Sequence, residues 1–228
     1  MKFLKVMAVL LLAFFLCIPA SAGGGKRTHV EGSDNWGYQG GPELSSTRVI
    51  CPRDELSDNP FPCPDLLTGR IHVRDGAGWS CWTSDDPRTT GLGLWVSNVN
   101  FDADANAEAW GEWYVVPVVG CNKDAAYSDE YGDLARNATS FWYGTWNGER
   151  QFDSDQNAWV LTVTMQGKGF GEGLDGLQYK GMEWITTFTP LPAPYEAIFP
   201  PGTVEYDMPE AYFIGVITEN KNHKYEDD

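Results

Sequence analysis

Two short runs of the chain carry acidic and amide side chains at alternate positions, a spacing that could bind a metal ion. The first run comprises Asp102, Asp104 and Asn106, and the second comprises Asp153, Asp155 and Asn157. Oxygen ligands at alternate positions open a calcium loop, but the glycine at its sixth position and the glutamate at its twelfth are absent from both runs. We therefore interpret both runs as tight turns, whose Asp and Asn side chains bond their own backbone, and keep calcium as the alternative cofactor.

Ten tryptophans make aromatic recognition the second candidate chemistry. Rings at a barrel mouth or on an exposed sheet stack on flat apolar ligands or on sugar faces. The candidate ligand-binding residues lie in one stretch of the chain, and they are Trp142, Trp146, Trp159, Gly167, Gly169, Gly171 and Gly173. The competing interpretation is that these rings are core, because most of the tryptophans fall at inward-facing strand positions.

The sequence shows no catalytic motif. Residues 171–176 match G-x-G-x-x-G, but strand-like sequence follows them, whereas a dinucleotide-binding fold needs a helix there. Acidic pairs such as Asp85 with Asp86, and Glu108 with Glu112, could do acid–base chemistry only if burial raised one pKa. We name no catalytic residue and keep a cyclase-like or isomerase-like enzyme with a buried carboxylate as an alternative.

The first 22 residues have the pattern of a signal peptide: two lysines, an apolar run at 6–18 and a cleavage site at Ala20-Ser21-Ala22. We therefore expect a secreted or periplasmic protein without a membrane span. Since that segment holds two of the 16 basic residues and none of the 32 acidic ones, the mature chain has a formal net charge of −18. Such a charge disfavours nucleic-acid partners, which require basic surfaces.

Four cysteines remain once the segment containing Cys17 is removed, namely Cys51, Cys63, Cys81 and Cys121. An even number in an exported chain predicts two disulfides, which can be connected in three ways. We favour Cys51 with Cys63 and Cys81 with Cys121, although only geometry decides between the three.

The elements that must position these residues are short strands. A segment at 93–107 recurs 51 residues later at 144–158, and each copy leads into a strand that begins near Trp110 or Trp159. Two copies fit two similar hairpins in an antiparallel meander. No segment has a helical period, so the sequence predicts an all-β fold, an antiparallel meander barrel of about eight strands. The predicted parts are an irregular, disulfide-stapled extension at 23–66, the barrel at 67–218 and a polar tail at 219–228.

Side-chain parity within the second hairpin favours a barrel. Trp159, Leu161, Val163 and Met165 share one face of their strand and should point inward, and the same parity continues through the glycines at 167, 169, 171 and 173. On the facing arm, Trp142 and Trp146 share a face with Gly144 and Gly148, so their rings could lie over the glycines at 167 to 173 on the neighbouring strand.

Five short motifs between residues 84 and 217 carry a resemblance to a known family. They are Asp86-Pro87-Arg88-Thr89-Thr90-Gly91, Trp110-Gly111-Glu112-Trp113, Gly144-Thr145-Trp146-Asn147-Gly148, the glycine ladder ending at Gly176-Leu177, and Phe213-Ile214-Gly215-Val216-Ile217. They resemble an uncharacterised group of secreted bacterial β-barrel proteins, in which Thr stands at the position of Glu112. The glycine ladder is also distantly similar to allene-oxide-cyclase-like and lipocalin-like barrels. The resemblance implies an antiparallel barrel with an interior ligand site and supplies no catalytic residue.

The sequence therefore leaves three functions open. The first is a non-catalytic barrel that binds a small hydrophobic or carbohydrate ligand through tryptophans, the second is the carboxylate-dependent enzyme, and the third is a structural component of the cell surface. An interior filled by Trp142 and Trp146 would favour the structural function, whereas a buried carboxylate would favour the enzyme.

Overall fold

The computed structural model describes residues 25–36, 48–50, 71–102, 104–121, 134–188 and 210–219. Its elements are β1 (Arg27–Trp36), β2 (Arg48–Ile50), β3 (Ile71–Ser84), the 3-10 turn η2 (Pro87–Thr89), β4 (Gly91–Phe101), β5 (Ala107–Pro117), β6 (Phe141–Asp153), β7 (Ala158–Phe170), β8 (Leu177–Thr187) and β9 (Glu210–Glu219). The predicted signal peptide, the pair Cys51 and Cys63, and all but the first residue of the polar tail lie outside these ranges.

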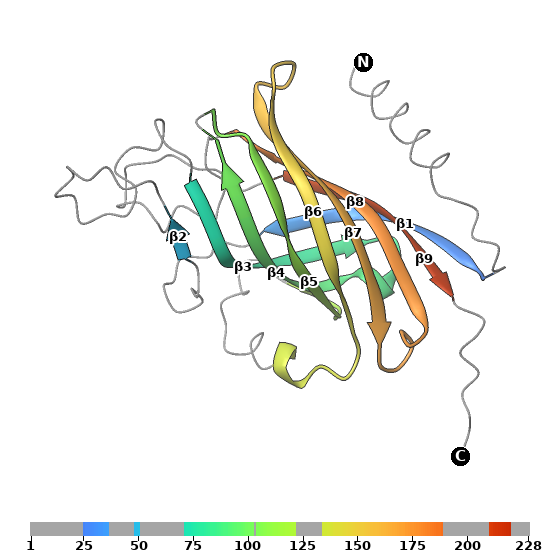
Figure 1. Ribbon diagram of the computed structural model, residues 1–228. Helices are drawn as coiled ribbons and strands as arrows, with labels where there is room; N and C mark the ends of the chain where they lie inside the picture. The colour runs from blue at the N-terminus through green and yellow to red at the C-terminus, as the bar shows by residue number, and fades with distance from the viewer. Residues whose placement is uncertain are drawn as a thin grey trace.

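One sheet contains all the strands and closes on itself (Figure 1). From β3 to β9, each strand pairs antiparallel with the next one in the chain. Strand β1 pairs with both β9 and β3 and so closes the ring. The result is a ring of eight antiparallel strands, while the short strand β2 adds to the first part of β3. The predicted all-β fold with an eight-stranded antiparallel ring is therefore confirmed.

The ring begins 40 residues earlier than the boundary that the sequence suggested. We placed the barrel at 67–218, but β1 starts at Arg27 and closes the ring between β3 and β9. Its inward residues alternate as Thr28, Val30, Gly32 and Asp34, of which only Val30 is a large apolar residue. Because the inward face is small and polar, the usual alternation of apolar and polar residues is not visible in this segment.

The third strand is longer and more irregular than its sequence indicates. Asp75 and Gly76 have turn-forming character, yet β3 runs through them without a turn. Val73 pairs with Val99 and Gly76 with Ser97, so β3 has one extra residue here, which is a β-bulge. The glycine marks a bulge, which bends a barrel strand without ending it.

The repeated segments form the two hairpins that the 51-residue offset predicts, β4–β5 and β6–β7. Trp95 and Trp146, at equivalent positions of the two copies, point into the barrel and contact edge to face, with ring centroids 6.1 Å apart. The tips also touch, because Asn106 of the first turn accepts a hydrogen bond from the backbone N–H of Phe152, at 3.1 Å.

The glycine ladder ends earlier than its parity suggests. β7 stops at Phe170, and Gly171 and Gly173 lie in the following turn with φ of 83° and 76°. That turn is closed by the Asp175 carboxylate, which accepts from the Gly171 N–H at 2.8 Å. Leu174, which parity placed on the outer face, is buried and folds back over Gly169, where an added Cβ would lie 2.8 Å from the Leu174 Cβ.

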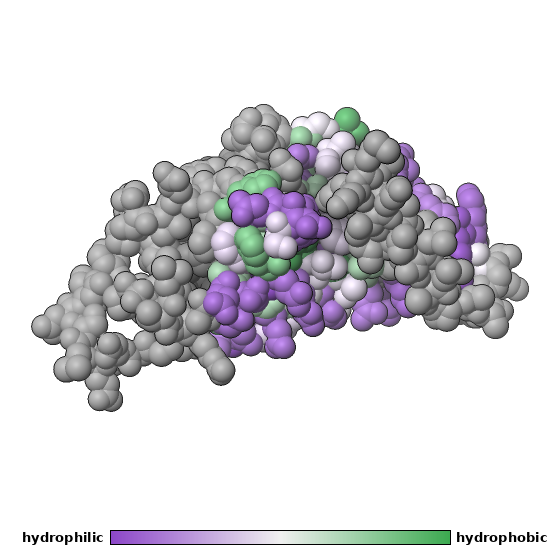
Figure 2. Space-filling view, turned by 90° about the horizontal axis from the view of Figure 1, so that it is seen from above, coloured by the Kyte–Doolittle hydropathy of each residue, from purple (hydrophilic) through white to green (hydrophobic). Residues whose placement is uncertain are grey.

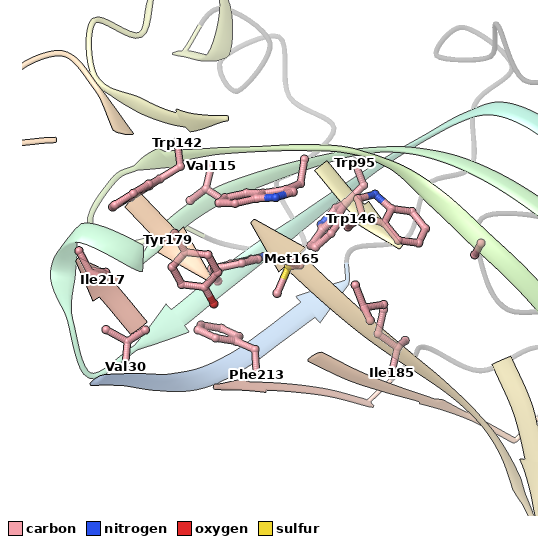
Figure 3. Packing of buried hydrophobic residues seen from close by; sticks show 14 of the residues in the cluster. Val30, Trp95, Val115, Trp142, Trp146, Met165, Tyr179, Ile185, Phe213 and Ile217 are labelled. Carbon is pink, nitrogen blue, oxygen red and sulfur yellow. The ribbon is translucent and has the colours of Figure 1, made fainter. Parts of the chain in front are cut away.

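Aromatic rings pack against one another inside the barrel, and several of them lie over glycines of neighbouring strands. A Cβ at Gly167 would meet Cζ2 of Trp113 at 2.5 Å, so the ring above this glycine comes from β5, whereas the sequence suggested Trp142 or Trp146 of β6. In Figure 3, Tyr179 lies between Trp142 and Phe213, with its hydroxyl on the Phe213 side. Alternating rings and bare backbone is how a narrow barrel is packed.

The Asp-Pro-Arg segment packs against the interior from the turn between β3 and β4. Asp86 caps η2, accepting from the backbone N–H of Arg88 at 2.9 Å, and binds its guanidinium at 2.7 Å. The Arg88 carbonyl in turn accepts from the indole N–H of Trp142 at 2.7 Å. This arrangement ties the turn to the core, so the motif has a structural role in this chain.

The disulfide Cys81–Cys121 is formed, as predicted, with 5.7 Å between the two Cα atoms. It joins β3 to the chain just after β5 and therefore encloses the first hairpin.

Seen from above, the described surface has apolar residues at its centre and polar residues around them (Figure 2).

Candidate ligand site inside the barrel

Two carboxyl groups lie inside the barrel, Asp34 of β1 and Glu183 of β8. Their side chains are 1% and 0% exposed. β9 runs between their strands, where Asp34 pairs with Ala211 and Glu183 with Phe213. Since Ala211 and Phe213 share the inward face of β9, both carboxyl groups point into the same part of the interior.

The two carboxyl groups belong to a cluster of buried polar atoms. Both oxygens of each, the indole N–H of Trp82 and the hydroxyl of Tyr179 are fully buried, and none makes a hydrogen bond of normal geometry to the described residues. The Asp34 carboxyl group lies beside Ser80, Trp82 and Glu183, close enough for them to influence its pKa. Buried polar atoms in folded proteins nearly always have partners, so this cluster is unusual.

Burial also changes the protonation of both carboxyl groups. Removal from water raises the pKa of Asp34 from 3.8 to about 7, and its contacts with Ser80, Glu183 and Trp82 partly oppose the rise. Burial, followed by the negative charge of Asp34 and the contact with it, raises the pKa of Glu183 well above 4.5. Because both pKa values are raised and the two groups interact, the pair retains protons at a pH where exposed carboxylates are ionised.

Aromatic rings surround the pair. Trp82 and Phe213, the neighbours of Asp34 and Glu183 on adjacent strands, have ring centroids 4.4 Å apart, and Trp82 stacks on Trp113 at 5.8 Å. Burial also raises the pKa of the Tyr179 hydroxyl, with a further contribution from the charge of Glu183, so this group stays protonated. The carboxyl pair therefore lies among aromatic rings with a few converging polar groups, the kind of residues that line small-molecule sites.

The tryptophans singled out from the sequence lie elsewhere in the interior. Trp142 and Trp146 are 1% and 5% exposed, and their indole N–H groups donate to the carbonyls of Arg88 and Glu112. Trp159 is half-buried and donates to the carbonyl of Asp104 at 3.4 Å. These three rings are packed as core, and their polar atoms are already bonded to the backbone.

The glycines proposed with these rings are not a free surface either. Trp113 covers Gly167 and Leu174 covers Gly169, while Gly171 and Gly173 belong to the turn after β7. A ligand that contacted the first two would have to displace a side chain that now packs there.

The two Asp/Asn runs form tight turns. Asp102 accepts from the N–H groups of Asp104 and Asn106, both at 2.9 Å, and so closes its own turn. Asp153 accepts from the N–H of Asp155 at 2.9 Å, and Asn157 has the left-handed φ of 53°. In the described parts of the chain, no three His, Cys, Asp or Glu side chains gather closely enough to hold a metal ion.

The carboxylates considered from the sequence are not the buried ones. Asp85, Glu108 and Glu112 are exposed, and Asp86 is paired with Arg88. Sequence reasoning missed Glu183, although a signal was present. Lys180 is charged and must face solvent, so it lies on the outer face of β8. Because side chains alternate along a strand, Tyr179, Gly181 and Glu183 must then point inward.

No family model, curated protein or solved structure matches this chain. The resemblance of residues 84–217 to secreted bacterial barrels therefore stays a prediction. In the described residues, no helix has the length and apolar character needed to cross a membrane.

Proposed function

We propose that this protein is an exported, non-catalytic barrel that binds one small molecule in its interior, anchored by Asp34 and Glu183. The observation that supports the proposal is a cluster of six fully buried polar atoms that make no hydrogen bond of normal geometry to the described residues, although the Asp34 carboxyl group lies against Ser80, Trp82 and Glu183. An unpaired buried polar atom costs on the order of 1–3 kcal/mol, so the cluster favours a bound molecule that supplies the missing partners.

The packing of Trp142 and Trp146 as core counts against the ligand site expected from the sequence and favours a structural role there, so the binding proposal rests on another part of the interior, the carboxyl cluster. An eight-stranded barrel is filled by side chains or holds one small ligand. Because Trp142, Trp146 and Trp159 are packed as core, the contacts we propose are the carboxyl pair with Trp82, Tyr179 and Phe213. The disulfide Cys81–Cys121 supports export to an oxidising compartment.

Native mass spectrometry of the full chain, produced by an exporting host and purified without denaturation, tests the proposal. We expect a mass increment that survives gentle ionisation and disappears on denaturation. The double variant Asp34→Asn with Glu183→Gln should lose the increment, whereas Glu172→Gln, which alters an exposed carboxylate in the turn after β7, should retain it. A wild-type protein that carries only water, and whose melting temperature no small molecule in a broad screen raises, would contradict the proposal.

The second candidate function is acid–base catalysis, of the isomerase or cyclase type. The observation in its favour is the pKa of about 7 for Asp34, beside a second carboxyl group whose pKa is also raised. One group could remove a proton from a bound carbon acid while the other returns one. Incubation of the retained molecule with protein in D₂O checks this function. Exchange of a carbon-bound hydrogen that Asp34→Asn abolishes supports an enzyme, and no exchange leaves simple binding.

A further inference from the structure

We infer that the interior site selects a small organic cation, a protonated amine attached to an apolar body. The inference rests on the proposed function, since it names the chemical class of the ligand that the barrel would hold.

The balance of donors and acceptors in the cluster is the first argument. Asp34 and Glu183 present four acceptor oxygens. Together the two carboxyl groups have about eight lone-pair sites, and the donors beside them are the Ser80 O–H, the Trp82 N–H, the Tyr179 O–H and the protons that the pair retains. A ligand that completes the cluster must therefore be mainly a donor, and a primary ammonium group provides three N–H donors at one point.

Charge is the second argument. Every proton that the carboxyl pair loses leaves a negative charge that is buried where water does not screen it. The strands beside the pair present Ala211 and Phe213 on β9, Val163 on β7, and Ser80 and Trp82 on β3, none of which carries a positive charge. A cationic ligand would compensate the buried charge, whereas a carboxylate or phosphate ligand would add a second like charge and be rejected.

The aromatic lining is the third, independent argument. The rings of Trp82 and Phe213 lie together beside the pair, and the fully buried Trp82 N–H lies against the Asp34 carboxyl group. Ring faces attract ammonium groups, and the attraction is stronger in a desolvated site than at an exposed one. The same rings accept the apolar body of the ligand, so one site accounts for both parts of an aromatic or aliphatic amine.

Three probes of nearly equal shape separate charge from size: 2-phenylethylamine, 2-phenylethanol and phenylacetate. Their affinities for the full chain can be measured by isothermal titration calorimetry at pH 7 after the retained ligand has been removed. We expect the amine to bind at least about tenfold more tightly than the alcohol, and phenylacetate not to bind. Native mass spectrometry of the molecule that the protein retains should show a protonatable nitrogen.

Variants identify the groups responsible. Asp34→Asn and Glu183→Gln keep the size of each side chain, so the barrel should still fold, which near-ultraviolet circular dichroism checks. Each should weaken amine binding at least about tenfold and change alcohol binding less than about threefold, and Glu172→Gln should change neither.

The outcomes separate the two proposals. If the alcohol binds as tightly as the amine, if the two variants weaken both probes equally, or if the retained molecule is neutral or anionic, the cation inference is wrong and interior binding stands. If neither the amine nor the alcohol binds and the native protein carries only water, interior binding fails as well.

Discussion

The ring of Tyr179 on β8 lies directly over the backbone of Gly215 on β9. A Cβ at position 215 would stand 2.6 Å from the Tyr179 hydroxyl oxygen and 2.7 Å from two ring carbons. The backbone of Gly215 has no left-handed φ, so the glycine is required for space and not for conformation. We expect Gly215→Ala to lower the free energy of unfolding by about 1–3 kcal/mol, because the ring must move within a filled interior.

A double-mutant cycle in urea tests this contact. In a Tyr179→Leu background the same Gly215→Ala change should cost clearly less, since the ring that it meets is gone. An equal cost in both backgrounds would mean that the ring does not limit the space at this position.

The carboxyl pair should make the ligand-free protein less stable as the pH rises. Both groups are harder to ionise in the folded chain than in the unfolded chain, so the folded state holds more protons. Their stabilising effect is complete below about pH 4, declines as the pH rises through about 7 for Asp34, and declines further as Glu183, whose pKa is also raised, ionises. Between pH 5.5 and 8, surface carboxylates are already ionised. Over this range we expect the free energy of unfolding to fall by an amount on the order of 2 kcal/mol.

Urea unfolding across this pH range, followed by tryptophan fluorescence, measures the effect. Asp34→Asn should flatten the pH dependence and be more stable than wild type at pH 8, because it removes the ionisation of a buried group. Glu172→Gln should follow the wild-type curve. Stability that is constant or rises over this range would show that the pair is not held in its protonated form.

The disulfide between Cys81 and Cys121 should contribute strongly to stability. It closes a loop with a sequence separation of 40 that contains β4 and β5, and the chain-entropy estimate for such a loop is about 4 kcal/mol. We expect the double change Cys81→Ala with Cys121→Ala to shift the urea midpoint accordingly. A reductant should lower the urea midpoint of the wild-type protein in the same way. It should not cause this shift in the double variant, which lacks the bond. A double variant as stable as wild type would mean that the unfolded chain is not constrained by this bond.

The Asp/Asn turns should hold their shape without calcium. The Oδ1 atoms of Asp102 and Asp153 already accept backbone N–H groups, so an ion would have to compete with these bonds. We expect the melting temperature to differ by less than about 1 °C between millimolar calcium and a chelator. A rise of several degrees with calcium, lost in Asp102→Ala, would establish the metal site that the alternating oxygens resemble.

The sequence predicts most of the fold because the central strands alternate strongly. The paired hairpins and the inward parity of Val163 and Met165 follow from local patterns, whereas the Cys81–Cys121 bond was one preference among three connectivities that geometry decided. Strand β1 was missed because it lacks this alternation. Its inward side is built from Thr28, Gly32 and Asp34 around a single valine.

The candidate site was harder to predict, because it depends on residues that break the pattern. A tryptophan at an inward position is recognisable as such, but which ring covers which glycine depends on neighbouring strands and their stagger, as Trp113 over Gly167 shows. Asp34 and Glu183 are 149 positions apart and meet only because β9 lies between their strands. No local pattern contains that information.

Closure of the ring by β1 sets a condition on how the chain can fold. The first strand pairs with the last, as in the contact of Arg27 with Thr218, so the barrel cannot close until almost the whole chain has been synthesised. Until then β1 and β8 each present an unpaired edge, the kind of edge that promotes association between chains. Loss of β9 would therefore leave a molecule with two such edges and its carboxyl groups open to water, prone to aggregate before it could bind anything.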